Sequence, residues 1–303
     1  MKTAKSLDEF LFYARRKPTA VFYDESEYEY VEGNNFDTEF RKYKGRELFD
    51  DDATDVFNGK LPLPLMIKAA TERALPEGLR SQIALASWAR AVLIKDDKAA
   101  SELARILEGL HPEMKGDLGE YLSAQNIEDR EFAAAFIMLK NPGIKPFLEP
   151  GIGRTVGLGG IENFRDNWWC AVSKTKPENL RYREDNRAVI PDNEVVQFPA
   201  FIRPEERDAA NKEWIKLGKM DTGASYLPRI VLKYAASHPR DPRIAEALHL
   251  AVRATRYGCI EDESESYACG NLTEVSRLSK AAFTLLHKKY SKSQWAKKTP
   301  YWF

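Results

Sequence analysis

The chain has 303 residues, of which 43% are hydrophobic and 30% are charged. This length and composition exclude a collagen-like, low-complexity or small disulfide-rich protein, and they predict a folded globular chain of about two domains. Lys plus Arg and Asp plus Glu both total 46, so no overall charge draws the molecule to nucleic acid or acidic lipid.

The start of the chain lacks the pattern of an export signal. Charges at Lys2, Lys5 and Arg15 interrupt the apolar core that a signal peptide requires. No apolar run reaches the roughly 18 residues of a membrane span. We therefore expect a cytoplasmic protein without a membrane span from the chain as given, and a periplasmic one if a signal peptide was removed or omitted.

Residues 1–60 are acidic, with ten Lys or Arg against 14 Asp or Glu. Tyr28 and Tyr30 alternate with Glu27 and Glu29, which is typical of a strand or an extended arm. The three consecutive aspartates at 50–52 lack the ligand spacing of a calcium loop. They are interpreted as the acidic start of a helix. We expect residues 1–60 to form an acidic N-terminal arm.

Residues 61–140 have the apolar spacing of a helical array. Ala99, Leu103 and Leu107 repeat every four residues, with charged residues on the other face. Proline in the first turn of a helix loses no useful hydrogen bond, so Pro76 and Pro112 predict two helix starts 36 residues apart.

A similar interval occurs in residues 204–303. Pro204 and Pro242 predict two helix starts that lie 38 residues apart. Helix pairs at intervals of about 34–47 residues are typical of tetratricopeptide, HEAT and armadillo arrays. We therefore expect an all-α fold with little sheet: a right-handed solenoid of helix hairpins, of tetratricopeptide or HEAT type.

Residues 141–203 are expected to form an irregular connector between the two helical regions. They hold six of the 16 prolines and six of the 17 glycines. The glycines match neither phosphate-binding pattern, so a crossing between helices is favoured over a nucleotide site. Trp168 and Trp169 are expected to pack onto the helices, because a disordered linker has no use for two adjacent tryptophans.

The end of the chain resembles a tetratricopeptide repeat of bacterial envelope-assembly proteins. The matching residues, which correspond to the second helix and exit turn of that repeat, are Ala282, Phe283, Leu286, Tyr290, Ser293 and Ala296. Ser291 stands where the family commonly has proline. The match covers about one tenth of the chain, and it implies a scaffold that binds a peptide or protein.

The final residues are expected to leave the last helix. Pro300 disfavours the helical conformation at Thr299, which predicts the helix end there. Tyr301, Trp302 and Phe303 then form an apolar tail. Docking of this tail on its own chain is favoured, and association with another chain is the alternative.

Histidine and cysteine spacing does not predict a catalytic or metal site. Cys259 follows His249 by ten residues, and no spacing indicates a thiol and imidazole pair with either His249 or His287. The three cysteines, Cys170, Cys259 and Cys269, contain no zinc-binding pair, so neither metal nor cofactor is expected. In an oxidising compartment, Cys259–Cys269 is the favoured disulfide.

These observations together favour a non-enzymatic scaffold, or a subunit of a larger bacterial assembly, that binds a protein or peptide in a helical groove. The candidate interaction residues are Trp168, Trp169, His249, Arg253, Arg256, His287, Trp295, Trp302 and Phe303. One alternative is an all-helical enzyme with His or Cys groups in the groove. A second is a single-strand nucleic-acid binder that uses the lysines and aromatic residues of 288–302, although a solvated face with a terminal cap is favoured there.

Overall fold

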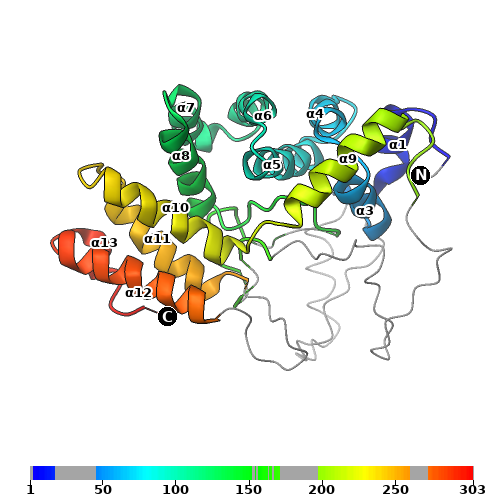
Figure 1. Cartoon of the computed structure of the whole chain (residues 1–303). Helices are drawn as coiled ribbons and strands as arrows, with labels where there is room; N and C mark the ends of the chain where they lie inside the picture. The colour runs from blue at the N-terminus through cyan, green and yellow to red at the C-terminus, as the bar shows by residue number, and fades with distance from the viewer. Residues whose placement is uncertain are drawn as a thin grey trace, which may run out of the picture.

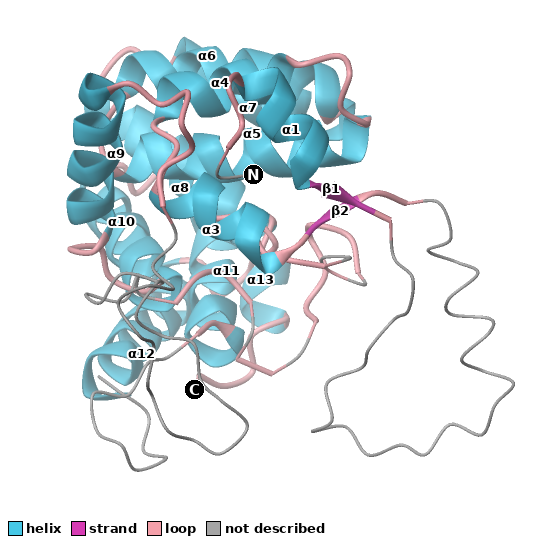
Figure 2. Cartoon of the chain, turned by 90° about the vertical axis from the view of Figure 1, so that its right-hand side faces the viewer, coloured by secondary structure: helices cyan, strands magenta, loops and turns pink. Residues whose placement is uncertain are grey.

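The computed structural model describes residues 3–17, 46–151, 154, 156–162, 164–165, 167–170, 197–259 and 272–302. This part of the chain is mostly helical, which confirms the expected all-α class (Figure 1). Its described strands are β1 (Arg15–Arg16) and β2 (Leu48–Phe49), which pair antiparallel (Figure 2). The strand or arm expected at 27–30 lies outside the described residues.

The helices form two runs on either side of the connector. The first run consists of α1 (Leu7–Ala14), α3 (Asp51–Gly59), α4 (Leu63–Thr71), α5 (Glu77–Leu93), α6 (Asp97–Leu110), the 3-10 turn η1 (Pro112–Met114), α7 (Lys115–Ser123) and α8 (Ile127–Lys140). The second run consists of α9 (Pro204–Leu217), α10 (Gly223–Ser237), α11 (Ile244–Tyr257), α12 (Leu272–Lys289) and α13 (Gln294–Lys297).

Proline and capping side chains set several helix starts. Pro76 is the N-cap of α5, and Pro204 is the first residue of α9, as expected. Pro112 opens a single 3-10 turn that continues into α7. At the start of α6, where no proline is present, the Asp96 carboxylate accepts the Ala99 amide hydrogen at 3.0 Å.

Neighbouring helices pack against one another in both runs. In the first run α4 packs on α5, α5 on α6, α6 on α7 and α7 on α8; in the second, α10 packs on α11 and α11 on α12. Only residues 94–96 separate α5 from α6, and such a short loop makes the two helices antiparallel. Helix α8 contacts both α10 and α11, so the second run extends the first (Figure 1).

Helix α9 crosses back over the first run, where it contacts α3 (Figure 1). Its Glu213 accepts the Leu63 amide hydrogen at 3.0 Å and lies 3.8 Å from Nη1 of Arg90. Arg90 is 1% exposed, and it also donates to the carbonyl oxygens of Leu61 at 3.2 Å and Asn58 at 3.1 Å. Burial lowers the pKa of Arg90 to about 10, against the opposing effect of Glu213.

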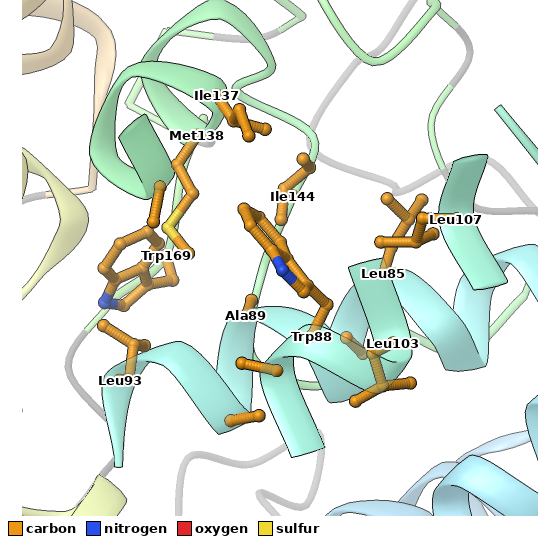
Figure 3. Close-up of a cluster of buried hydrophobic side chains, with 14 of the residues drawn as sticks. Leu85, Trp88, Ala89, Leu93, Leu103, Leu107, Ile137, Met138, Ile144 and Trp169 are labelled. Carbon is orange, nitrogen blue, oxygen red and sulfur yellow. The ribbon is translucent and has the colours of Figure 1, made fainter. Parts of the chain in front are cut away.

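The buried apolar side chains form one contiguous core shared by both runs and the connector. Figure 3 shows Trp88 from α5 and Trp169 from the connector in the same cluster, with Leu93, Met138 and Ile144. Trp88 and Trp169 are almost completely buried. The connector therefore contributes to the core between the helices.

Candidate functional site

A hollow of about 650 Å³ lies where the first turns of α5 meet β2 and the connector. This volume falls within the range of small-molecule sites. Its lining includes the apolar residues Leu48, Leu79, Leu85, Phe147, Leu148 and Leu158. Its charged lining residues are Arg46, Glu47, Lys145, Glu149 and Arg154.

Ser81, His111 and Glu113 form a chain of hydrogen bonds at this hollow, and the first two line it. Ser81 Oγ is 2.7 Å from His111 Nε2, and His111 Nδ1 is 2.8 Å from Glu113 Oε1. The hydrogen bond from His111 holds the pKa of Glu113 below its ordinary value. The ionised carboxylate accepts the Nδ1 hydrogen, which leaves Nε2 to accept the hydrogen of the Ser81 hydroxyl.

The helix hairpin of α5 and α6 brings these three residues together. His111 follows the last residue of α6, and Pro112 begins the turn that places Glu113 beside the imidazole. Ser81 and His111 lie at similar distances along the chain from the hairpin loop at 94–96, so antiparallel packing places them at the same end. Spacing in the sequence does not identify these three residues as a group, because a similar distance from the loop places two residues at one end of the hairpin without showing that their side chains meet.

The charged groups of the hollow have partners from within the chain. Lys145 pairs with Glu149, and Arg154 Nη1 lies 3.6 Å from a carboxylate oxygen of Glu162. The side chain of Arg154 lies close against the backbone at Gly143, where an added Cβ would lie 2.7 Å from Arg154 Cδ. These contacts fix the Arg154 side chain in the wall of the 650 Å³ hollow.

A second hollow, of about 260 Å³, lies where α5, α7, α8 and α10 meet. Charged residues at its rim form the pairs Lys95 with Glu131, and Arg130 with Asp97 at 3.9 Å. Ile127, also among the lining residues, is 72% exposed. The other lining residues are Val92, Tyr121, Ala134, Ala135, Met138, Tyr226 and Ile230.

Trp168 and Trp169 are both buried, which confirms that these two residues of the connector pack onto the helices. Trp168 Nε1 donates to the Met138 carbonyl oxygen at 2.9 Å, and Trp169 Nε1 donates to that of Asp221 at 3.0 Å. Gly223 begins α10 beside them, and an added Cβ there would lie 2.8 Å from Trp168 Cβ. These two candidate interaction residues therefore lie in the core rather than at the surface.

The disulfide differs from the expected one. Cys259 is bonded to Cys170, with their Cα atoms 5.0 Å apart, and a sulfur forms only one disulfide, so the expected Cys259–Cys269 pair is wrong. The cause is the path of the connector: the Cys259 amide donates to the Asn167 carbonyl oxygen at 3.1 Å, which holds residues 167–170 beside the end of α11. Cys269 lies outside the described residues.

His249 and His287 meet at the C-terminal end, where both hold Thr299. The Thr299 hydroxyl donates to the Trp295 carbonyl oxygen at 2.8 Å, so it accepts from His249 Nδ1 at 2.7 Å. His287 Nε2 donates to the Thr299 carbonyl oxygen at 2.8 Å. Two of the candidate interaction residues therefore fasten the end of their own chain.

The C-terminal tail docks on its own chain, as favoured from the sequence. Thr299 is buried, the ring of Trp302 lies 5.2 Å from that of Phe283, and Arg256 lies over the ring of Tyr301 at 4.7 Å. Tyr301 and Trp302 nevertheless keep 56% and 38% of their surface exposed. The tail is thus partly covered by α11 and α12.

The remaining candidate interaction residues lie in different surroundings. Lys298 lies over the Trp295 ring at 4.6 Å, so a cation of the same chain covers a face that a nucleic-acid base would need. Arg253 is half-buried on α11. Phe303 lies outside the described residues.

We expect the chain to lose stability as the pH falls below about 6.5. Burial, together with Arg253 and Lys298, lowers the pKa of His249 to about 4. The unfolded chain binds this proton near pH 6.5, so the stability provided by neutral His249 is complete above that pH and is lost as the pH falls toward 4.

Urea unfolding of the wild type and of the H249N variant at pH 7 and pH 4.5 measures this effect. The loss of unfolding free energy on acidification should be smaller in H249N, by on the order of 2 kcal/mol. An equal loss in the two proteins would contradict the prediction.

The described residues contain neither a metal-binding cluster nor a membrane-spanning helix. Among the described residues, no group of three or more His, Cys, Asp and Glu side chains is placed to hold a metal ion. No helix in the described ranges is both long and apolar enough to cross a membrane. No protein-family model, curated protein or solved structure matches the chain.

Proposed function

We propose that this chain is a protein-binding scaffold, built as a right-handed array of helix hairpins of the tetratricopeptide or HEAT type. The packing of α8 on α10 supports this proposal, because it continues the row of neighbouring helices from the first run into the second. An array of this kind offers a surface longer than that of one hairpin, along which a segment of a partner protein can lie.

The observation that carries the proposal is the 260 Å³ hollow between the two runs. Its volume is below the roughly 300 Å³ at which small-molecule sites begin, so it suits one large apolar side chain of a partner. Protein interfaces commonly combine an apolar anchor in a pocket with a polar rim that excludes water. This hollow has an apolar lining that can hold such an anchor and charged residues that form a polar rim.

Ile127 and the ion pairs at the rim indicate which types of residue the partner segment carries. Ile127 is 72% exposed, and covering it with a partner removes apolar surface from water. The pairs Lys95 with Glu131 and Arg130 with Asp97 place charges of both signs around the opening. The partner segment is therefore expected to carry an aromatic or branched aliphatic residue flanked by polar residues.

Selection of a displayed library of random peptides on the full chain tests this proposal. The enriched peptides should share one aromatic or branched aliphatic residue and bind the I127D variant roughly tenfold more weakly than the wild type. Ile215→Asp is the matched control, because Ile215 is 58% exposed on α9 and does not line the hollow. Failure to enrich such peptides, or equal affinity for I127D and wild type, would contradict the proposal.

A further inference from the structure

We propose that Ser81, His111 and Glu113 hydrolyse carboxylic esters that enter the 650 Å³ hollow. This activity is additional to the scaffold function and does not depend on it. The two hollows have different lining residues, so each can be tested by variants that leave the other unchanged.

The order of the hydrogen bonds is the one that serine hydrolases use. In those enzymes the serine hydroxyl donates to Nε2 of the histidine, and a carboxylate accepts from Nδ1. Here the two contacts are 2.7 Å from Ser81 Oγ to His111 Nε2 and 2.8 Å from His111 Nδ1 to Glu113 Oε1. Glu113 fixes the tautomer in which the imidazole can accept the proton of the nucleophile.

In two other described contacts between a hydroxyl and a histidine, the hydroxyl does not donate its proton to the imidazole. Ser237 Oγ lies 3.0 Å from Nδ1 of the adjacent His238, but its hydroxyl donates to Glu128 Oε1 at 2.7 Å. The Thr299 hydroxyl donates to a backbone carbonyl. Of these three contacts, only that of Ser81 directs the hydroxyl proton to an imidazole nitrogen in the wall of a described hollow.

The surroundings of Ser81 suit attack on a carbonyl carbon. Ser81 is half-buried and the His111 side chain is 14% exposed, so both can be reached from the hollow. Gly78, in the first turn of α5, lines the same wall one turn before Ser81. The positive end of this 17-residue helix favours the negative charge that develops on the carbonyl oxygen.

The reaction follows from these positions. Ser81 Oγ bonds to the ester carbonyl carbon as its proton passes to His111 Nε2, and the bond from that carbon to the alcohol oxygen breaks as the alcohol takes the proton. Water then attacks the acylated serine and gives a proton to His111. That proton returns to Ser81 Oγ as the carboxylic acid leaves.

The lining of the hollow indicates the class of ester. Leu79, Leu85, Phe147 and Leu148 provide apolar surface, while Lys145 and its partner Glu149 neutralise each other. An uncharged ester with an apolar acyl chain therefore fits better than a charged one. The side chain of Glu113 is 67% exposed and acts as a positioning residue, since it contacts the imidazole rather than the substrate.

Labelling with a fluorophosphonate and hydrolysis of p-nitrophenyl butyrate test the proposal on the full chain. The phosphonate should bond to Ser81 Oγ with loss of fluoride, as located by mass spectrometry of peptides. S81A should lose ester hydrolysis by roughly 100-fold or more. The matched control S237A, which removes the other hydroxyl beside a histidine, should hydrolyse the ester like the wild type.

E113Q separates positioning from folding. Because Glu113 is largely exposed, this variant should keep the melting temperature of the wild type while kcat falls roughly tenfold or more and KM stays unchanged. Alanine suits a helix interior, so S81A should also fold.

Failure of the phosphonate to label wild-type Ser81 would overturn the proposal. So would equal ester hydrolysis by folded S81A and the wild type. A lower melting temperature of S81A without labelling of the wild type would show that Ser81 and His111 only tie α5 to the end of α6. The result of the peptide-binding experiment with I127D does not affect any of these outcomes. The scaffold proposal and the ester-hydrolysis proposal can therefore be refuted independently of each other.

Discussion

Replacing Cys170 and Cys259 together with serine should lower the free energy of unfolding by about 2–5 kcal/mol. The disulfide joins residues that are 89 positions apart, and closing so long a loop restricts the unfolded chain strongly. It also fixes residues 167–170 of the connector beside the end of α11, where the Cys259 amide donates to the Asn167 carbonyl oxygen. Denaturant unfolding of the oxidised wild type and the double variant measures the difference.

Cys269→Ser is the control for this experiment. The bond between Cys170 and Cys259 leaves Cys269 no further cysteine within the chain, which contains three. The control should therefore unfold at the same denaturant concentration as the wild type. A stability loss in C269S that matches the loss in the double variant would instead indicate a bond to Cys269.

Trp168→Ala and Trp169→Ala should each lower the free energy of unfolding by about 3–5 kcal/mol, as large-to-small aromatic substitutions in cores do. Both side chains are 1% exposed, so alanine leaves a cavity between the connector and the helices. Each substitution also removes an indole donor from a backbone carbonyl oxygen, that of Met138 or Asp221. Denaturant unfolding of the full chain at pH 7 measures these losses.

Trp302→Ala is the matched control, because Trp302 keeps 38% of its surface exposed. Its loss of stability should stay below about 1 kcal/mol, since the side chain is only partly covered. Unchanged unfolding of W168A and W169A would mean that the connector does not contribute to the core.

The all-α class and many helix positions could be predicted because they depend on local rules. The repeat of Ala99, Leu103 and Leu107 marks the buried face of α6, and all three are buried. Pro76 and Pro204 mark helix starts because the missing amide hydrogen costs nothing there. The adjacent tryptophans also indicated a packed connector without any knowledge of what they contact.

The remaining features depend on contacts between distant segments. The pairing of Cys259 with Cys170 follows from the path of the connector, which periodicity does not reveal. The contact of Ser81 with His111 depends on how α5 and α6 align in their hairpin, and spacing rules for catalytic residues do not include that alignment. The sequence offers His249 and His287 as candidate interaction residues, but their common partner Thr299 is visible only once the tail is docked.

The burial of Arg90 under α9 has a consequence for synthesis on the ribosome. Arg90 is translated well before Glu213, the carboxylate that lies beside it in the finished protein. At about 5–20 residues per second, this interval is on the order of ten seconds, during which the nascent first run lacks α9. Leu61 and Asn58, the other partners of Arg90, precede it in the chain, so during this interval Arg90 lacks only its carboxylate partner. We therefore expect the guanidinium to reach its final burial only once α9 has emerged.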